Sequence, residues 1–462
     1  MTASETPEGA ADGTMSPGLF AFAAVAVSLG LSDVWRFPHL LAEHASPWFP
    51  ALYLGALLLI GVPLMVAELA LARLGHSRPS SNYGFTLGGD NRGALWQYTG
   101  IVILVAVFVI LSYASVVAGW MVSYSVRASI GGLSGVSTGA ARLMFQSLIT
   151  DPERLLGWHT LFMVGLGWVA ARGVNAGTGR ISRILVAAVF FLAAVLAAIS
   201  LYRYGARSLL AMDWSSQWTA LSGALVVDAV TQAFFTLGVC MGAILVLGHY
   251  LPRGARPGGL VMSVVAADIL FVSLAAAGVL PLLFAADSPG AGLSFAVETL
   301  PVALSEETLG GLFLGLFYFL LFLLVATTAV VLMEVLVSWL CEKSGRTRAA
   351  VTPLAAAAVW VGGVLALLSF SALSFDFEFV GEERSYGLFD VMDILSSQIL
   401  LPVIGVLMAV FVGWNVDKNK LKEALGDSRA VTVLHFLKRY VVPAMVAAIL
   451  VALVFGRVLS RV

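Results

Sequence analysis

An aspartate and an arginine stand inside the first apolar segment of this 462-residue chain. Asp33 and Arg36 are three residues apart, so on a helix they share one face. Gly30 and Ser32 weaken a helix just before this pair, and Pro38 cannot donate a backbone hydrogen bond just after it. In lipid, an ionisable side chain is costly unless it faces a partner, a bound ion or a water-filled cavity. These residues are therefore the first candidates for a functional site.

The composition indicates that membrane helices must position this site. Hydrophobic residues make up 60% of the chain and charged residues 11%, whereas a soluble domain has about 25% charged residues. Eleven apolar runs are long enough to cross about 30 Å of hydrocarbon as helices. They lie near residues 18–41, 47–72, 94–126, 156–172, 184–202, 222–250, 259–286, 309–340, 350–370, 391–414 and 440–459. We expect an all-α polytopic membrane protein with 11 transmembrane helices.

The distribution of basic residues predicts the orientation. Most lysines and arginines lie in one alternate set of the connections between the apolar runs, and such an excess marks the cytoplasmic side. The chain is thus predicted to be a multi-pass protein of the inner (plasma) membrane with a cytoplasmic N-terminus. Residues 1–17 are predicted to be a disordered cytoplasmic tail, residues 18–414 the core, and residues 415–462 a cytoplasmic loop and the eleventh helix.

Two apolar runs are interrupted in comparable ways. The first contains Ser28 to Asp33, and the sixth contains Thr236 to Gly242, with glycines in both. The two runs are five spans apart, so a five-helix unit repeated once would enter the membrane in opposite orientations. Glycine-interrupted segments at matching positions of two halves indicate the midplane site of a transporter. The repeats would cover about residues 18–202 and 222–414.

These motifs resemble the neurotransmitter:sodium symporter family. Leu31 to Pro38 is similar to the family's first-helix signature, which ends in Trp-Arg-Phe-Pro, and Gln232 to Gly238 is close to its sixth-helix motif. Further similarities are Gly61-Val62-Pro63-Leu64 with Glu68, Ala118-Gly119-Trp120, and Phe389-Asp390 through Gly413-Trp414. The resemblance implies a five-plus-five inverted repeat with broken helices 1 and 6, a central site between helices 1, 3, 6 and 8, and an eleventh helix.

The resemblance also implies a sodium site on helix 8. Thr327 and Thr328 match the family's two adjacent hydroxyls, and the carbonyls would come from Ala26, Leu29 and Leu324. Sodium is a hard cation, and hard cations take oxygen ligands. Taken without the resemblance, two threonines in a membrane helix more often bond to their own carbonyls one turn back.

A second cation site is implied at Ser28, Asp33, Thr236 and Asp268. The family has asparagine at the position of Asp33, so two carboxylates converge on one cation here. Two such charges lie close together only with a cation or a proton between them. Asp33 could therefore bind sodium more strongly, carry a proton, or face a cationic substrate.

The residues expected around the substrate depart from the family pattern. The tyrosine that helps to anchor a substrate carboxylate is replaced by Ala114, and Ser32 replaces a glycine. A negative Asp33 would repel a carboxylate as well. We expect a substrate other than a standard α-amino acid bound in the family's usual way. The positions implied for substrate binding are Ser28, Ser32, Asp33, Ala114, Phe235, Gly238 and Met241.

Two gates follow from the same resemblance. Arg36, Gln232 and Asp393 match the extracellular gate, and Tyr250 and Glu342 match positions of the cytoplasmic gate. The N-terminal tail lacks the arginine and tryptophan that close the cytoplasmic side in the family. Another contact must take their place, and the sequence does not identify it.

We interpret the chain as a secondary active transporter that moves a small organic solute, amino-acid-like or an amine, in symport with sodium by alternating access. Its expected partners are this solute, the sodium ion and the lipid bilayer, with no nucleic acid. Cys240 and Met241 beside two carboxylates leave a transition-metal transporter or metal-binding relative as an alternative. A transport-deficient regulatory membrane protein is the other. No spacing of an enzyme motif occurs, so we expect no enzyme and no catalytic residues.

Overall fold

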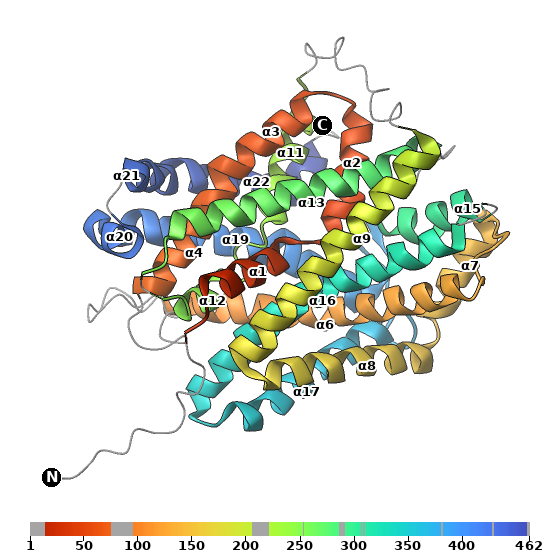
Figure 1. Cartoon of the computed structure of the whole chain (residues 1–462), viewed down its shortest axis with the longest axis horizontal. Coiled ribbons are helices and arrows are strands. Elements are labelled where there is room, and N and C mark those ends of the chain that lie inside the picture. The colour runs from red at the N-terminus through yellow and green to blue at the C-terminus, as the bar shows by residue number, and fades with distance from the viewer. Residues whose placement is uncertain are drawn as a thin grey trace.

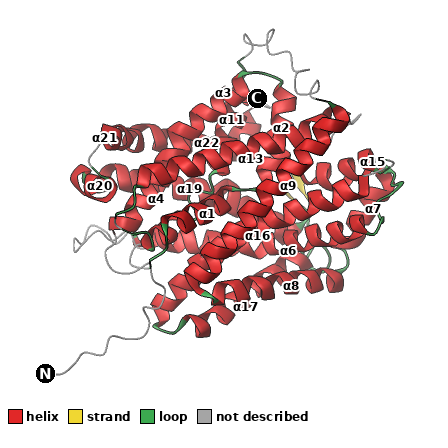
Figure 2. Cartoon of the chain, in the orientation of Figure 1, coloured by secondary structure: helices red, strands yellow, loops and turns green. Residues whose placement is uncertain are grey.

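The structure, a computed structural model, describes residues 14–74, 96–205, 221–252, 254–285, 292–305, 307, 310–379, 382–426 and 429–459. These residues form helices almost throughout, and the short yellow strand in Figure 2 belongs to one small hairpin. Its strands, Phe377–Phe379 (β1) and Glu382–Arg384 (β2), pair antiparallel with Glu378 opposite Glu383. Residues 1–13 of the predicted tail lie outside the described part.

The first half of the chain contains one span that is broken and two π-helical turns. Its elements are Pro17–Ser28 (α1), Leu31–His44 (α2), Trp48–Ala56 (α3), the π-helical turn Leu57–Gly61 (η1), Val62–Leu74 (α4), Gln97–Ser129 (α6), Thr138–Ile149 (α7), Pro152–Ala171 (α8), the π-helical turn Val174–Gly179 (η3) and Arg180–Tyr204 (α9).

The second half repeats this alternation of long helices and short breaks. Its elements are Gly223–Thr236 (α11), Ala243–His249 (α12), Pro257–Ala285 (α13), Gly292–Ser294 (α14), Phe295–Thr299 (η4), Leu300–Leu304 (α15), Gly310–Ser344 (α16), Arg348–Leu368 (α17), Gly387–Asp393 (α18), Ile394–Leu400 (η5), Leu401–Val410 (α19), Phe411–Asn415 (η6), Lys418–Leu425 (α20), Arg429–Phe436 (α21), Leu437–Val441 (η7) and Val442–Leu459 (α22).

The helices have the length and polarity of a multi-pass membrane protein. Eight helices of the described residues are long and apolar enough to cross a membrane, and the bent pair α1 and α2 adds a ninth. The other two predicted spans, near residues 156–172 and 222–250, correspond to α8 and to the pair α11 and α12. The apolar runs of the sequence therefore became helices at the expected places.

The longest helix lies at the centre of the bundle. The apolar stretch of α16 is 89% buried within the protein, and α16 packs along α6, α9 and α17 (Figure 1). The helix α13 crosses α9 and also contacts α2, while α1 contacts α9, α13 and α16. This packing surrounds the break between α1 and α2 with long, continuous helices.

Candidate functional site

The first apolar run breaks where the sequence predicted. Helix α1 ends at Ser28, Leu29 and Gly30 are extended, and α2 starts at a bend of 55°. In an unbroken helix the Gly30 N–H would bond to the Ala26 carbonyl. Here it donates to Asp33 Oδ2 at 2.9 Å instead. The break therefore frees the Ala26 carbonyl from that bond and fixes the Asp33 carboxylate at the N-terminus of α2, where a negative charge is favoured.

The sixth run breaks beside the first. Between α11 and α12 the backbone has positive φ at Gly238, Cys240 and Gly242. A Cβ atom on Gly238 would lie 2.2 Å from the Val27 carbonyl oxygen, so only glycine allows the two breaks to approach this closely. The buried carboxylate of Glu68 accepts the N–H groups of Cys240 and Leu245. Those backbone groups, left unpaired by the break, are thereby satisfied.

Two buried carboxylates meet at these breaks. Asp33 and Asp268 are both 0% exposed, and the Thr236 hydroxyl lies 3.0 Å from Asp33 Oδ1 and 3.2 Å from both Asp268 oxygens. The Gln232 amide donates to Asp33 Oδ1 at 3.2 Å, and the Tyr53 hydroxyl donates to Asp268 Oδ2 at 3.2 Å. The structure thus brings together three members of the predicted second cation site. Ser28, the fourth, is buried at the end of α1 with its hydroxyl on the Val25 carbonyl.

Thr327 and Thr328, which were predicted to lie on the eighth membrane span, belong to α16. From there they reach the break between α1 and α2. Thr328 Oγ1 lies 3.2 Å from the Leu29 carbonyl oxygen and 3.3 Å from that of Leu324. Thr327 bonds to the Leu324 carbonyl at 2.7 Å. Each threonine therefore makes the bond to its own helix that is common in membrane helices, and Thr328 also contacts the broken first helix. Two of the three predicted carbonyls converge on this hydroxyl.

Arg36 forms an ion pair with a residue that the sequence interpretation did not name. Its Nη2 lies 3.8 Å from Asp228 Oδ1, and His44 Nε2 lies 3.0 Å from Asp228 Oδ2. The predicted gate residue Asp393 lies beside Tyr113 of α6, and Gln232 bonds to Asp33. We call Arg36, His44 and Asp228 the Asp228 cluster. It joins α2 to α11, the two helix segments that follow and precede the breaks.

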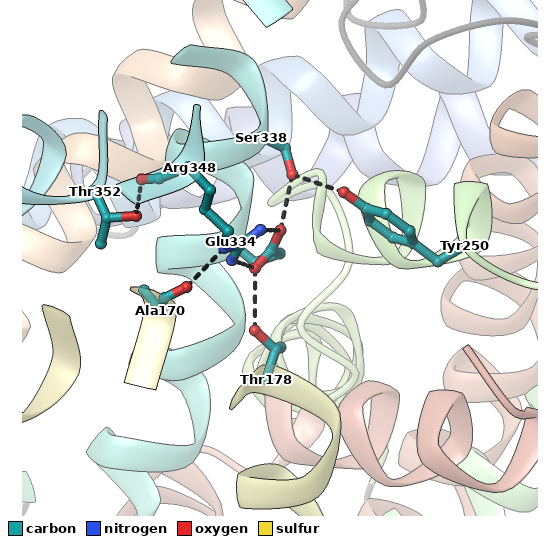
Figure 3. A network of polar contacts seen from close by, with 7 residues as sticks. All are labelled: Ala170, Thr178, Tyr250, Glu334, Ser338, Arg348 and Thr352. Atoms are coloured by element: carbon teal, nitrogen blue, oxygen red, sulfur yellow. Dashed lines mark hydrogen bonds and ion pairs between the residues drawn. The ribbon is translucent and has the colours of Figure 1, made fainter. Parts of the chain in front are cut away.

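A second polar network, the Glu334 cluster, consists of Glu334, Arg348, Thr178, Ser338 and Tyr250 (Figure 3). Glu334 is 0% exposed and accepts two N–H groups of the Arg348 guanidinium. It also accepts the hydroxyls of Thr178 at 3.1 Å and Ser338 at 2.9 Å. The Tyr250 hydroxyl lies 3.3 Å from Ser338 Oγ. The network therefore ties α16 and α17 to η3 and to the end of α12.

Each predicted cytoplasmic gate residue has a different place around this cluster. Tyr250 joins it through Ser338 and accepts the Met15 N–H on its carbonyl at 2.7 Å. Glu342 lies near His249, at the end of α16. The short segment before α1 thus packs against the end of α12 although it lacks the arginine and tryptophan of the family pattern.

The residues predicted for substrate binding lie along the breaks and on α6. Ser28, Ser32 and Asp33 belong to the first break, and Gly238 and Met241 to the sixth. Phe235 is half-buried in the last turn of α11, with its ring 5.0 Å from that of Phe234. Ala114 is half-buried on α6, beside Tyr113.

The sixth break contains two sulfur-bearing side chains, those of Cys240 and Met241. No group of three or more His, Cys, Asp or Glu residues is placed to hold a metal ion in the described part of the chain. Cys240 is fully buried, and its Sγ lies 3.2 Å from the position of a Cβ on Gly405 of α19. The thiol therefore fills an apolar gap, which is a common use of cysteine.

Some site residues were missed by the sequence interpretation. Asp228 and Glu334 each carried a usable signal, because an acid inside an apolar run needs a partner. Tyr53 carried none, since tyrosine is common in membrane proteins.

The chain is similar in sequence to sodium-dependent transporters and in structure to MhsT. No family model matches the chain. The sodium-dependent transporter YhdH of Bacillus subtilis is 26% identical over 441 residues, covering 94% of this chain and 96% of its own. A sodium-dependent transporter of Haemophilus influenzae is 23% identical over 93% of this chain and 95% of its own. The crystal structure of MhsT in complex with L-phenylalanine superposes with a TM-score of 0.80 at 29% identity, over 94% of this chain and 98% of that one.

Over nearly its whole length the chain is therefore similar to sodium-dependent transporters and to the transporter MhsT. Asp33, Thr236 and Thr328 lie at or beside the two breaks, within the network of contacts described above.

Proposed function

We propose that the chain is a sodium-coupled symporter of a small organic solute that works by alternating access. It is a transporter and not an enzyme. The observation that carries the proposal is the meeting of two broken helices at a buried set of oxygen atoms, contributed by Asp33, Thr236, Asp268, Thr328 and the Leu29 carbonyl. Unwound backbone and half-helix ends of this kind hold coupling ions in secondary transporters.

The proposed architecture has eleven transmembrane helices in two inverted five-helix repeats, near residues 18–202 and 222–414, followed by the eleventh helix. The protein would lie in the plasma membrane with its N-terminus in the cytoplasm. The positions of the two breaks, five spans apart and in contact at Gly238 and Val27, support the inverted repeat. In this orientation the Asp228 cluster faces outward and the Glu334 cluster faces the cytoplasm.

The first proposed sodium ion is held by Thr327, Thr328 and the carbonyls of Ala26, Leu29 and Leu324. Gly30 supports this site because its N–H bonds to Asp33 and leaves the Ala26 carbonyl available. Ser28, Asp33, Thr236 and Asp268 form the second proposed cation site. A cation between the two aspartates offsets the repulsion that their burial would otherwise make costly.

The substrate site is proposed to favour a solute with an ammonium group. Asp33 is fully buried, and the other residues proposed for substrate binding are Ser28, Ser32, Ala114, Phe235, Gly238 and Met241. At short range in a region of low dielectric, its charge attracts an ammonium and repels a carboxylate. MhsT was crystallised with L-phenylalanine. In this chain a solute carboxylate would need a place away from Asp33.

The two clusters are proposed to act as gates. Arg36 and Gln232, with Asp228 and Asp393, would close the outer path above the solute. Tyr250 and Glu342, together with the Glu334 cluster, would close the cytoplasmic path. In this proposal the Arg348 guanidinium, which donates two hydrogen bonds to Glu334, closes the cytoplasmic path in place of the arginine that the N-terminal tail lacks.

A binding panel tests this proposal. The thermal midpoint of the purified protein would be measured in sodium chloride and in choline chloride, with amines, amino acids and other small solutes. A ligand that binds only the folded state at 100 times its Kd adds about 2.7 kcal/mol of stability. We expect sodium to raise the midpoint and an amine to raise it further only in sodium. Ordinary α-amino acids that bind with sodium, and lose binding in Asp33→Asn, would contradict the substrate class.

A further inference from the structure

The start of the last membrane helix contains a buried cation that the transport site does not use. Lys438 lies in η7, a π-helical turn, and its side chain is 0% exposed. In the part of the chain that the structure describes, its Nζ has no hydrogen-bond partner. An ammonium that is buried without a partner is costly, and removing it from water is offset only by an anion. The π-helical turn also supports a functional role for Lys438, since such turns occur often at functional sites.

The groups around Lys438 are mostly basic. His435 is one helical turn earlier, and its buried Nδ1 also has no partner in the described part of the chain. Lys418, Lys438 and Arg439 act electrostatically on His435, and Asp417 is the one acid among them. The Asp417 carboxylate already accepts the Asn419 N–H at 2.9 Å, as the N-cap of α20. The cluster therefore offers several donors to an anion and little to a cation.

The approach of two chain segments fixes this cluster in place. A Cβ on Gly413 of η6 would lie 2.8 Å from Arg439 Cα and from the Lys438 carbonyl oxygen. The turn η7 also packs against α4 and α19. The backbone that carries Lys438 is thus held between neighbouring helices, and only the long, rotatable lysine side chain needs to move to reach a ligand.

Exposed aromatic side chains stand close to Lys438 in the sequence, at the end of α21 and in η7, and another lies in η6, which packs against η7. Trp414 is 58% exposed, Phe436 56% and Tyr440 54%. The Arg439 guanidinium lies 5.6 Å from the centre of the Tyr440 ring. Tryptophan and tyrosine gather at the headgroup level of membrane proteins, and basic pockets between helices on the cytoplasmic side bind anionic headgroups. The ligand that fits has phosphate oxygens and an acyl chain beside it.

We infer that Lys438, His435, Arg439 and Lys418 form a phosphate-binding site for an anionic phospholipid of the cytoplasmic leaflet. The leaflet assignment rests on the orientation in the proposed function, whereas the phosphate site does not. The Lys438 ammonium and the His435 ring donate to phosphate oxygens, Arg439 and Lys418 supply charge at the rim, and the acyl chains lie along the exposed aromatic side chains.

The test is the thermal midpoint of the full chain in detergent, titrated with phosphatidylglycerol, with phosphatidylcholine and with inorganic phosphate. We expect phosphatidylglycerol to raise the midpoint more than phosphatidylcholine does. In Lys438→Met the apparent affinity for phosphatidylglycerol should fall about tenfold or more, since a hydrogen bond to a charged group is lost. Lys420→Met is the matched control, because it removes an exposed charge from the neighbouring α20 and should keep the affinity.

Two further measurements of the thermal midpoint distinguish a ligand-binding role of Lys438 from a structural role. Without lipid, Lys438→Met should match or exceed the wild-type midpoint, because an apolar side chain replaces an unpaired buried charge. Stabilisation by inorganic phosphate alone that Lys438→Met abolishes would support a phosphate site filled from solution. Equal effects of both lipids, or an unchanged affinity in Lys438→Met, would overturn the inference. The sodium shift of the same samples reports separately on the proposed transport function.

Discussion

The Asp228 cluster and the Glu334 cluster lie on opposite sides of the helix breaks and are built very differently. The Arg36 and Asp228 side chains are 33% and 30% exposed, and their charged atoms are 3.8 Å apart. Glu334 is 0% exposed. Its carboxylate accepts hydrogen bonds from two N–H groups of the Arg348 guanidinium and from the hydroxyls of Thr178 and Ser338. An exposed ion pair contributes about 0–1 kcal/mol, whereas a buried carboxylate that loses its partner is strongly destabilising.

This difference indicates which side opens more easily. The Asp228 cluster can separate in water at little cost, because both side chains are already partly hydrated. The Glu334 cluster can separate only if its groups find other partners. The structure thus describes a molecule that is held firmly at the Glu334 cluster, while the Asp228 cluster is held by contacts that exchange readily with water.

The largest expected effect comes from breaking the Glu334 cluster. Arg348→Met leaves a buried carboxylate without its cation, which should lower the free energy of unfolding by about 3–5 kcal/mol. Combining Arg348→Met with Glu334→Leu should restore most of this loss, since apolar residues replace the whole pair. Denaturant unfolding in detergent measures both. A single variant as stable as the wild type would refute the difference between the clusters.

The next effect concerns the contact between the two breaks, which lies between the clusters. In Gly238→Ala the new Cβ meets the Val27 carbonyl, and the residue has φ of +58°. We expect a loss of about 2–3 kcal/mol from strain and overpacking, together with loss of solute binding. Gly165→Ala is the control, because open space surrounds that position. An unchanged midpoint in Gly238→Ala would show that the breaks do not need their close contact.

A smaller effect is expected at the proposed sodium site beside the broken first helix. Thr328→Ala removes the hydroxyl that contacts the Leu29 carbonyl. The half-saturating sodium concentration should rise about tenfold, equivalent to about 1.4 kcal/mol. The sodium dependence of the thermal midpoint measures this rise. Ser344→Ala, at the exposed end of the same helix, should leave it unchanged.

The smallest effect on stability is expected at the Asp228 cluster. Asp228→Asn should change the free energy of unfolding by less than about 1 kcal/mol. Solute dissociation should nevertheless become faster, since Arg36 and His44 lose their shared partner. Stopped-flow dissociation of a bound solute would show the difference. A large loss of stability would mean that the Asp228 cluster is as firmly built as the Glu334 cluster.

The helices and their breaks could be predicted from the sequence, because each depends on local features. Apolar runs define the spans, and Gly30 and Gly238 permit the interruptions. The meeting of Asp33, Thr236 and Asp268 was inferred from a family resemblance, and the structure brings these residues together. Their roles as ligands remain a prediction.

The partners of isolated charges could not be predicted in the same way. Glu334 and Asp228 stand out as acids in apolar runs, yet the partner of each depends on which helices pack together. Arg348 reaches Glu334 because α16 and α17 form a hairpin, and His44 reaches Asp228 across two elements far apart in the chain. The π-helical turns likewise have no simple sequence signal.

The most direct test of the account is solute uptake by proteoliposomes that contain the purified protein. The solute would be the one that the sodium-dependent binding panel identifies. With sodium outside and choline inside, we expect accumulation above the external concentration, because the sodium gradient supplies the work. With equal sodium on both sides and no membrane potential, only equilibration should occur. Uptake that is the same under both conditions would contradict sodium-coupled symport.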